Sequence, residues 1–274
     1  MLGADETSWR MMGKGRSKKW WVWGLSAPDA RYYRILPSRG QGAATLLLKD
    51  FGGTVMADGF SVYTALEHKA SKQPGTQLSL DGSEPLPLPD FLLACCWSHA
   101  RRYFVKAEKN YDVAGEALDI IAKLYEIEQR AEEGATDRAE LLRRRGELRD
   151  AESRQIIEQL HEWLRRQRPP PDTRLEQAIG YCLDRWGALK VFLSQPAVPL
   201  DNNHTELGMR DPVLGRRNFQ GTRSPEGARV AGLFYTLIGT CLLLGINPVE
   251  YLTFATRRAI DRPGTVTLPR TTPS

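Results

Sequence analysis

Apolar and polar positions alternate in short runs over the first part of the chain, a pattern that predicts β-strands. Residues 7–12 and 18–25 flank a glycine-rich turn at 13–17, which indicates a β-hairpin. Residues 32–36 predict a third strand, because they follow the turn formers at Pro28-Asp29. The chain is therefore expected to begin with three consecutive strands.

The pattern then changes between helical and extended spacing. Residues 39–50 carry apolar side chains at helical spacing, and the short apolar run at 54–57 predicts a buried strand. Prolines and glycines across residues 71–90 predict a loop. Residues 91–95 predict a fifth strand, which leads into a basic helix over 97–110. This order of strands and helices favours a mixed α/β fold.

The second half of the chain predicts mainly helices. Residues 113–168 are charged and amphipathic, which predicts two antiparallel helices with a solvated charged face of i,i+4 pairs and no binding site. Asp172 is a predicted N-cap for a helix that ends near residue 193. The uncharged segment 230–246 predicts a buried core helix more than a membrane span, because glycines and threonines dilute it. Asn247 predicts the cap of a last helix.

Composition narrows the class of protein without defining its function. The 274 residues are 41% hydrophobic and 26% charged, which excludes a disordered, collagen-like or coiled-coil chain. A formal net charge of +5 permits a polyanionic partner. Four cysteines without a CxxC pair predict neither a disulfide framework nor a structural zinc site. No signal peptide is visible, so we expect a cytoplasmic protein.

Four short stretches carry side chains suited to chemistry, namely A-D-E-T at 4–7, M-A-D-G-F at 56–60, C-C-W-S-H-A-R-R at 95–102 and P-L-D-N-N-H-T-E at 199–206. Each alone has an ordinary structural interpretation. An aspartate that ends a strand is usually a turn former, and D-N-N is a typical helix N-cap. A CxxH pair is more often core packing than a metal site, because zinc needs two further ligands.

Together and in this order, the four stretches resemble the transposases of the insertion-sequence-66 family. That family combines a D-D/E-T strand, an A-D-x-x-x-x-Y strand end, a C-W-x-H-x-R-R helix start and a D-N-N-x-x-E helix. Tyr63 stands in the expected place after Asp58. The sequence G-R-R-N at 215–218, the helix start at 227–231 and the segment at 247–252 extend the similarity. The resemblance covers nearly the whole chain.

The resemblance implies a ribonuclease-H-like mixed sheet flanked by helices, with a helical insertion before the last catalytic helix. The implied domains are a first part of the core at 1–110, the insertion at 111–195, the last part of the core with C-terminal helices at 196–262, and a disordered tail at 263–274. The 148 positions between the second and third family carboxylates (206 − 58) are consistent with such an insertion.

The resemblance also implies a DDE active site, in which Asp5, Asp58 and Glu206 are the catalytic carboxylates and the metal ligands. Carboxylate oxygens are the ligands that Mg²⁺ prefers, and Mn²⁺ can replace it, so two such ions are expected. The implied reactions are hydrolysis at the element end, which frees a 3′-hydroxyl, and transfer of that hydroxyl to target DNA.

Further residues receive roles by the same resemblance. His99 and Cys96 are expected to support the active site. The residues expected to contact DNA are Arg101, Arg102, Arg210, Arg216, Arg217, Asn202 and Asn203. The implied partners are element ends and target DNA, a second copy of the chain in a synaptic complex, and accessory proteins of the same element, with no membrane.

The sequence departs from the family pattern in two places. Leu207 replaces a basic residue, and Asp211 is inserted before the proline of the motif. Only four residues precede Asp5, so we expect the first strand to begin before Met1 and the chain to match the catalytic part alone. Two alternatives stay open, an inactive transposase remnant that binds DNA or oligomerises, and a related metal-dependent nuclease.

Overall fold

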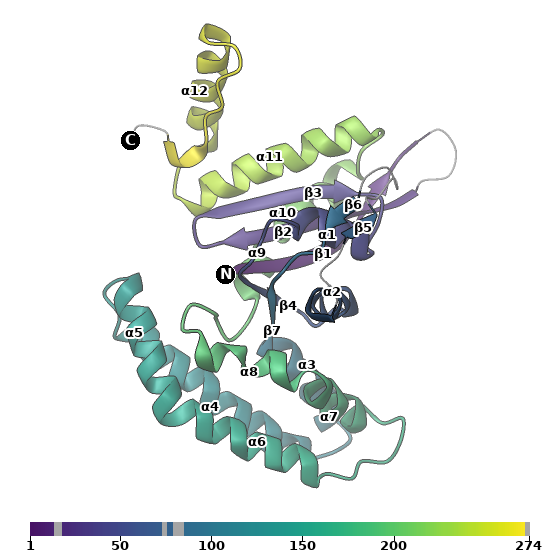
Figure 1. Cartoon of the computed structure of the whole chain (residues 1–274), viewed down its shortest axis with the longest axis vertical. Helices are drawn as coiled ribbons and strands as arrows, with labels where there is room; N and C mark the ends of the chain where they lie inside the picture. Colours follow the sequence, from purple (N-terminus) through teal and green to yellow (C-terminus); the bar gives the residue numbers. More distant parts are fainter. Residues whose placement is uncertain (14–17, 73–75, 79–84, 272–274) are drawn as a thin grey trace. The chain divides into compact units, whose positions relative to one another are not determined.

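The computed structural model describes residues 1–13, 18–72, 76–78 and 85–271. The chain divides into two compact units, each built from separate stretches of sequence. The helical unit comprises Met1, Gly52–Glu67 and Phe91–Asn202. The sheet unit comprises Leu2–Phe51, His68–Asp90 and Asn203–Ser274. Each unit is described below by itself, with the element labels of Figure 1.

Three antiparallel strands form the centre of the sheet unit. They are β1 (Leu2–Met11), β2 (Lys18–Ala27) and β3 (Ala30–Leu36). Trp9 of β1 lies opposite Trp20, and Asp5 lies opposite Gly24. The predicted strands are confirmed, and β1 includes residues from Leu2 on, five residues earlier than the alternation indicated. The predicted turn at 13–17 falls largely on residues outside the described ranges.

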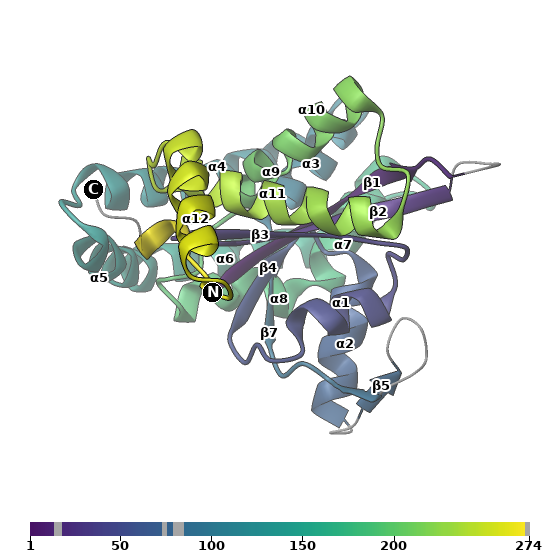
Figure 2. The ribbon, with the colours of Figure 1, turned by 90° about the horizontal axis from the view of Figure 1, so that it is seen from above.

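Helix α11 (Pro225–Leu243) lies along β3 (Figure 1 and Figure 2). Small residues allow this close packing, since a Cβ at Gly232 would lie 3.0 Å from the Tyr33 carbonyl oxygen. The hydroxyl of Thr236 accepts the Tyr33 amide at 2.9 Å, and that of Thr240 accepts the Arg31 amide at 3.1 Å. The glycines and threonines that dilute this apolar helix therefore form its contact with the strand.

The prediction that this helix is buried was wrong for its outer face. Leu233, Phe234 and Leu242 are 46%, 45% and 56% exposed. Among the described residues, no helix is both long and apolar enough to cross a membrane.

The remaining elements of the sheet unit are short. They are α1 (Gln41–Leu48), β5 (Thr76–Leu78), β6 (Pro85–Pro87), α9 (Asn203–Gly208), α10 (Arg210–Phe219), α12 (Pro248–Asp261) and a 3₁₀ turn at Pro269–Thr271. The antiparallel pair β5 and β6 corrects the predicted loop at 71–90. Asn247 caps α12 as predicted, by accepting the Val249 amide. Within the segment predicted to be a disordered tail, the Thr267 carbonyl accepts the Tyr251 hydroxyl at 2.8 Å.

In the helical unit, two buried strands pair in parallel, β4 (Thr54–Ala57) and β7 (Leu92–Cys95). The prediction for β4 is confirmed residue by residue. Helix α2 (Ser61–Lys72) follows β4 and passes into the sheet unit, and α3 (Trp97–Glu108) follows β7. With the antiparallel strands of the sheet unit, these pairings define a mixed α/β protein.

The charged segment folds into an antiparallel helical pair. One arm is α4 (Ala114–Glu133), and the other runs through α5 (Arg138–Leu148), a π-helical turn η1 (Arg149–Ser153) and α6 (Arg154–Arg166). Contacts between the arms confirm the antiparallel arrangement, because Trp163 donates to Glu116 at one end and Arg145 pairs with Glu132 at the other.

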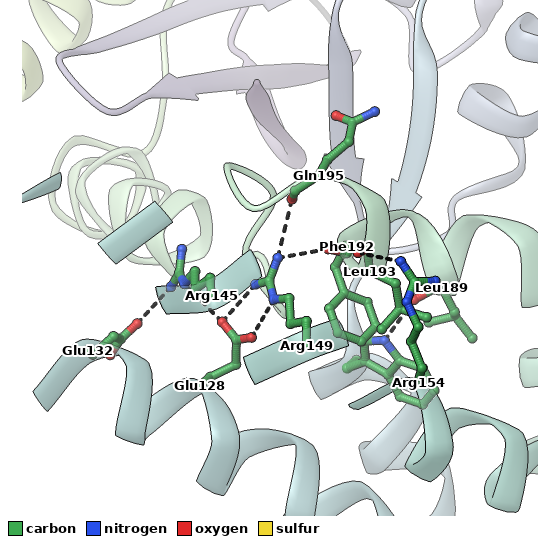
Figure 3. A network of polar contacts seen from close by, with 10 residues as sticks. Glu128, Glu132, Arg145, Arg149, Arg154, Leu189, Phe192, Leu193 and Gln195 are labelled. Carbon is green, nitrogen blue, oxygen red and sulfur yellow. Dashed lines mark hydrogen bonds and ion pairs between the residues drawn. The ribbon is translucent and has the colours of Figure 1, made fainter. Parts of the chain in front are cut away.

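One prediction about these helices was wrong. Arg149 is fully buried, and its guanidinium forms a bidentate pair with Glu128, at 2.7 Å from Nε to Oε1 and 2.8 Å from Nη2 to Oε2 (Figure 3). Its Nη1 donates to the Phe192 carbonyl at 2.8 Å. The exposed i,i+4 pairs are also present, for example Arg143 with Glu147. The charges of this segment thus include an internal network as well as a solvated face.

The predicted helix from Asp172 to residue 193 is two helices, α7 (Arg174–Asp184) and α8 (Trp186–Ser194). Thr173 is the N-cap, since its side chain accepts the Glu176 amide. Asp172 precedes it with a φ of 60°, in the left-handed region. Aspartate tolerates that conformation, which places it in the turn before the helix and not at the cap.

Candidate functional site

The structure brings two of the three predicted carboxylates together in the sheet unit. Asp5 of β1 and Glu206 of α9 line one cavity of about 400 Å³. The two residues come from opposite ends of the sequence, so the folding of the sheet unit creates this site. Neither strand alternation nor helix spacing alone indicates that they meet.

Packing beneath the cavity fixes α9 and α10 against the sheet. The Tyr33 hydroxyl donates to the Gly208 carbonyl at 2.8 Å, and Met209 belongs to a buried cluster with Trp9 and Val22. Gly24, which lies opposite Asp5, leaves room for the Met209 side chain; a Cβ there would collide with its sulfur. Burial raises the pKa of Tyr33 to about 12, so its hydroxyl stays protonated and can donate. Glu206 is thus held on a rigid support.

Basic side chains lie beside the two carboxylates. Arg210 and Arg217 line the same cavity from one face of α10, since they are seven residues apart. Arg216 points elsewhere, because its Nη1 donates to the Ser8 carbonyl and to the Ser8 hydroxyl at 2.9 Å. An arrangement of carboxylates beside arginines can hold a divalent cation and a phosphate at adjacent positions.

Glu6, the acidic neighbour of Asp5, has a separate structural role. Its Oε1 accepts the Arg39 guanidinium at 2.9 Å from Nε and 2.5 Å from Nη2, and its side chain is 1% exposed. The Glu6 amide in turn donates to Asp5 Oδ1 at 2.8 Å. Glu6 and Asp5 both line the cavity, and the charge of Glu6 is balanced there by Arg39.

Asp58 belongs to the helical unit, where it follows β4. Its Oδ1 accepts the Phe60 amide at 2.9 Å, which is the Asx turn expected of an aspartate that ends a strand. Its carbonyl accepts the Tyr181 hydroxyl at 2.7 Å. Gly59 follows with a φ of 86°, and a Cβ there would lie 2.6 Å from Arg185 Nε. Side chains of α7 and its C-terminal end thus fix the backbone that carries Asp58.

Cys96 and His99 lie at the start of α3, also in the helical unit. The Cys96 sulfur is fully buried and accepts the Asn202 amide at 3.2 Å. Burial raises the pKa of the Cys96 thiol, so it stays protonated. His99 is half-buried, and its Nε2 lies 3.3 Å from Nη1 of Arg102. Cys96 therefore connects the start of α3 with Asn202, the last residue of the helical unit. The support of the active site by Cys96 and His99 stays a prediction.

The other predicted DNA contacts differ in accessibility. Arg101 and Arg102 are exposed on α3, and Asn203 is exposed at the start of α9. Asn202 is buried, with 2% of its surface exposed. Contact with DNA stays a prediction for each of them.

The two departures from the family pattern also have defined places. Leu207 is 49% exposed on α9, next to Glu206 in sequence. Asp211 Oδ2 lies 4.0 Å from Nη1 of Arg31, so the inserted acid has a basic neighbour in the sheet unit. Burial and the nearby Arg31 charge lower the pKa of His204, which keeps that imidazole neutral near pH 7.

A model of the family described as "Transposase IS66 family" matches residues 1–230. The chain therefore belongs to the IS66 family of transposases.

Curated relatives match most of this chain, and their names describe them as uncharacterized proteins. The chain is 28% identical over 267 residues to the uncharacterized protein y4qI of Sinorhizobium fredii (strain NBRC 101917 / NGR234), covering 91% of this chain and 46% of the relative. It is 29% identical over 258 residues to the uncharacterized protein y4hP of the same strain, covering 88% of this chain and 43% of the relative. The chain thus spans less than half the length of these relatives.

Proposed function

We propose that the chain carries the catalytic region of a DDE-type transposase with a ribonuclease-H-like core. In this proposal Asp5, Asp58 and Glu206 are the catalytic carboxylates, and the reactions are hydrolysis of a DNA phosphodiester and transfer of the freed 3′-hydroxyl. The observation that carries the proposal is the cavity of the sheet unit, where Asp5 and Glu206 lie beside two arginines. Membership of the IS66 family supports the same conclusion.

The donor set of this cavity fits a divalent metal ion. The cavity offers the carboxylate oxygens of Asp5 and Glu206. Oxygen ligands of this kind suit Mg²⁺ and Mn²⁺ better than softer metals. Asp5, Glu206 and Asp58 would hold the metal, with two ions expected for this class of reaction. When bound, the metal activates the attacking oxygen and stabilises the leaving oxygen.

The arginines of the cavity have a separate task. Arg210 and Arg217 are both exposed, and both lie on the face of α10 that lines the cavity. Their guanidinium groups can donate hydrogen bonds to nonbridging phosphate oxygens and hold the strand in register. Arg101, Arg102 and Asn203 would extend these contacts along the DNA, and pairing of two element ends would require self-association.

A catalytically inactive DNA-binding remnant is the second candidate. The observation that favours it is Leu207, an exposed apolar side chain where the family has a basic one. Loss of that cation would weaken a DNA or carboxylate contact beside Glu206. Both candidates bind DNA, so strand cleavage separates them.

Incubation of the purified chain with supercoiled plasmid is expected to produce nicked DNA in the presence of Mg²⁺ or Mn²⁺ and none with EDTA. The nicks should carry 3′-hydroxyl ends, which a DNA polymerase extends directly. Asp5→Asn should abolish nicking, because it removes a metal-binding charge while keeping the size of the side chain. Asp29→Asn is the matched control, since Asp29 is an exposed carboxylate at the β2–β3 turn that pairs with Arg270.

Equal nicking by the Asp5→Asn protein would contradict the assignment. The absence of nicking by the wild-type chain, together with retained duplex binding, would favour the inactive remnant.

A further inference from the structure

A second cavity of the sheet unit is lined by cations, and none of its described lining residues is acidic. It has a volume of about 520 Å³ and lies at the end of the β1–β2 hairpin. Its charged lining consists of Arg10, Lys18, Lys19 and Arg216. None of these residues lines the cavity that holds Asp5 and Glu206. We call this second cavity the hairpin pocket.

The cations of the hairpin pocket are close together without counter-charges. Arg10 lies directly opposite Lys19 in the antiparallel register, so both side chains leave the sheet on the same face. Among the residues that the structure describes, none forms an ion pair with Arg10, Lys18 or Lys19. Like charges directly opposite one another destabilise a hairpin. A bound anion would offset this repulsion.

Arg216 is fixed in place before any ligand binds. Its Nη1 donates to the Ser8 carbonyl, the Ser8 hydroxyl at 2.9 Å and the Thr7 hydroxyl at 3.2 Å. Its Nε and Nη2 have no acceptor within the described part of the chain. A guanidinium held by one nitrogen can present the other two to a phosphate with little further loss of conformational entropy.

The backbone after α10 closes the pocket against β1. The Met12 amide donates to the Thr222 carbonyl at 2.6 Å, and the Thr222 amide donates to the Arg10 carbonyl at 3.1 Å. Gln220 has a φ of 67° and Gly221 a φ of 141°, and a Cβ at Gly221 would collide with the Arg10 carbonyl oxygen. This tight connection attaches the end of α10 to the strand edge and places Arg216 beside the hairpin cations.

The position of the pocket relates it to the catalytic candidates. Asp5 and Arg10 stand five residues apart on β1, about 17 Å at about 3.4 Å per residue, and this odd separation directs their side chains to opposite faces of the strand. The hairpin pocket is therefore a contact point at the far end of β1, apart from the cavity that holds Asp5 and Glu206.

We propose that the hairpin pocket is a phosphodiester-binding site for the DNA backbone, distinct from the cavity that holds Asp5 and Glu206. It takes phosphate groups without reading base sequence, because lysine and arginine contacts to phosphate carry no sequence information. This inference rests on the proposed DNA-processing function and extends it to a site that positions the strand.

The test compares duplex binding by the wild type and by the double variant Arg10→Gln/Lys19→Gln. A labelled duplex of random sequence is titrated at several NaCl concentrations and followed by fluorescence anisotropy. Each phosphate contact contributes about 0.9 to the slope of log affinity against log salt, so the variant should lose about 1.8 of that slope. Its affinity near about 100 mM NaCl should fall at least about tenfold. Its thermal midpoint should stay equal or rise, because the variant removes a like-charge pair.

The matched control is Lys49→Gln/Lys190→Gln, which removes the same net charge from exposed lysines elsewhere. Equal slopes in the two double variants would overturn the site. A second result would also overturn it. If inorganic phosphate raises the thermal midpoint of the wild type while the salt slope of duplex binding is the same in the wild type and in Arg10→Gln/Lys19→Gln, the pocket binds free phosphate and not DNA. If the wild type fails to bind duplex at all, the proposed DNA-processing function fails with it. If the double variant lowers the salt slope of duplex binding but neither the wild type nor any variant cleaves DNA, the phosphate-binding site is supported and only the proposed catalytic activity is rejected.

Discussion

Replacement of Glu206 with glutamine is expected to lower metal-dependent strand cleavage by about 10²–10³-fold while leaving the fold intact. Removing one carboxylate ligand forfeits several kcal/mol of charge stabilisation in the transition state, and each 1.36 kcal/mol is tenfold in rate. The glutamine keeps the size of the side chain, so the packing of α9 on Tyr33 and Met209 should persist. Rates of plasmid nicking measure the effect.

Glu226→Gln is the control for this prediction. Glu226 is an exposed carboxylate in the first turn of α11, and it is paired with Arg229. The Glu226→Gln protein should cleave plasmid DNA at the wild-type rate. Duplex binding by Glu206→Gln should be retained, which separates a catalytic defect from a binding defect. A wild-type cleavage rate in Glu206→Gln would refute the role of this carboxylate.

Arg149→Met is expected to lower the free energy of unfolding by up to about 3–5 kcal/mol, because it removes the fully buried partner of the Glu128 carboxylate and leaves only Arg145, at 3.0 Å. Glu128 is 7% exposed and accepts two hydrogen bonds from Arg149 (Figure 3). The Phe192 and Gln195 carbonyls also lose one of their donors in this variant. Denaturant unfolding followed by circular dichroism gives the change.

Two further variants test the physical cause. Arg143→Met removes an exposed arginine from the same helical arm and should lower the stability far less than Arg149→Met, because solvated ion pairs contribute little. The double variant Arg149→Met/Glu128→Leu should recover part of the lost stability, because it removes the buried carboxylate together with its buried partner, while Arg145 keeps Glu132 as a partner at 2.8 Å. Equal stability of Arg149→Met and Arg143→Met would contradict the account of a buried pair.

Local patterns predicted the elements whose structure depends on local physics. The run at Thr54–Ala57 is apolar throughout, and the strand occupies those residues. Asn247 followed by proline combines a capping side chain with a residue that fits the first helical turn, and α12 begins there. The early alternation gave the three antiparallel strands, although β1 extends through Asp5 where the alternation is weaker.

Patterns failed where tertiary contacts decide. Arg149 has the sequence context of a solvated face, yet the π-turn at Arg149–Ser153 inserts an extra residue into the helical repeat and changes which side chains face inward. The apolar part of helix α11 is half-exposed because its small residues, and not its leucines, face β3. Sequence periodicity reports only the spacing of apolar residues along the chain. The burial of Arg149 and the exposure of the leucines of α11 depend on which other elements pack against these helices.

The site was predictable in part for the same reason. Asp58 stands at a strand end by its local pattern, and its Asx turn follows from that position. The meeting of Asp5 with Glu206 required the family resemblance, since nothing local connects β1 with α9. The hairpin pocket was not predicted, because Arg10 and Lys19 become neighbours only through strand register, and Arg216 joins them through the connection after α10.

The central claim is that Asp5, Asp58 and Glu206 hold a divalent metal ion, and a thermal melt with and without Mn²⁺ tests it most directly. A ligand that binds only the native state raises its stability, by about 2.7 kcal/mol at 100 times its dissociation constant. The account predicts that Mn²⁺ raises the midpoint of the wild type and leaves those of Asp58→Asn and Glu206→Gln unchanged. Asparagine retains the oxygen that accepts the Phe60 amide, so the Asx turn is preserved in the first variant. An equal rise in the wild type and both variants would contradict the claim.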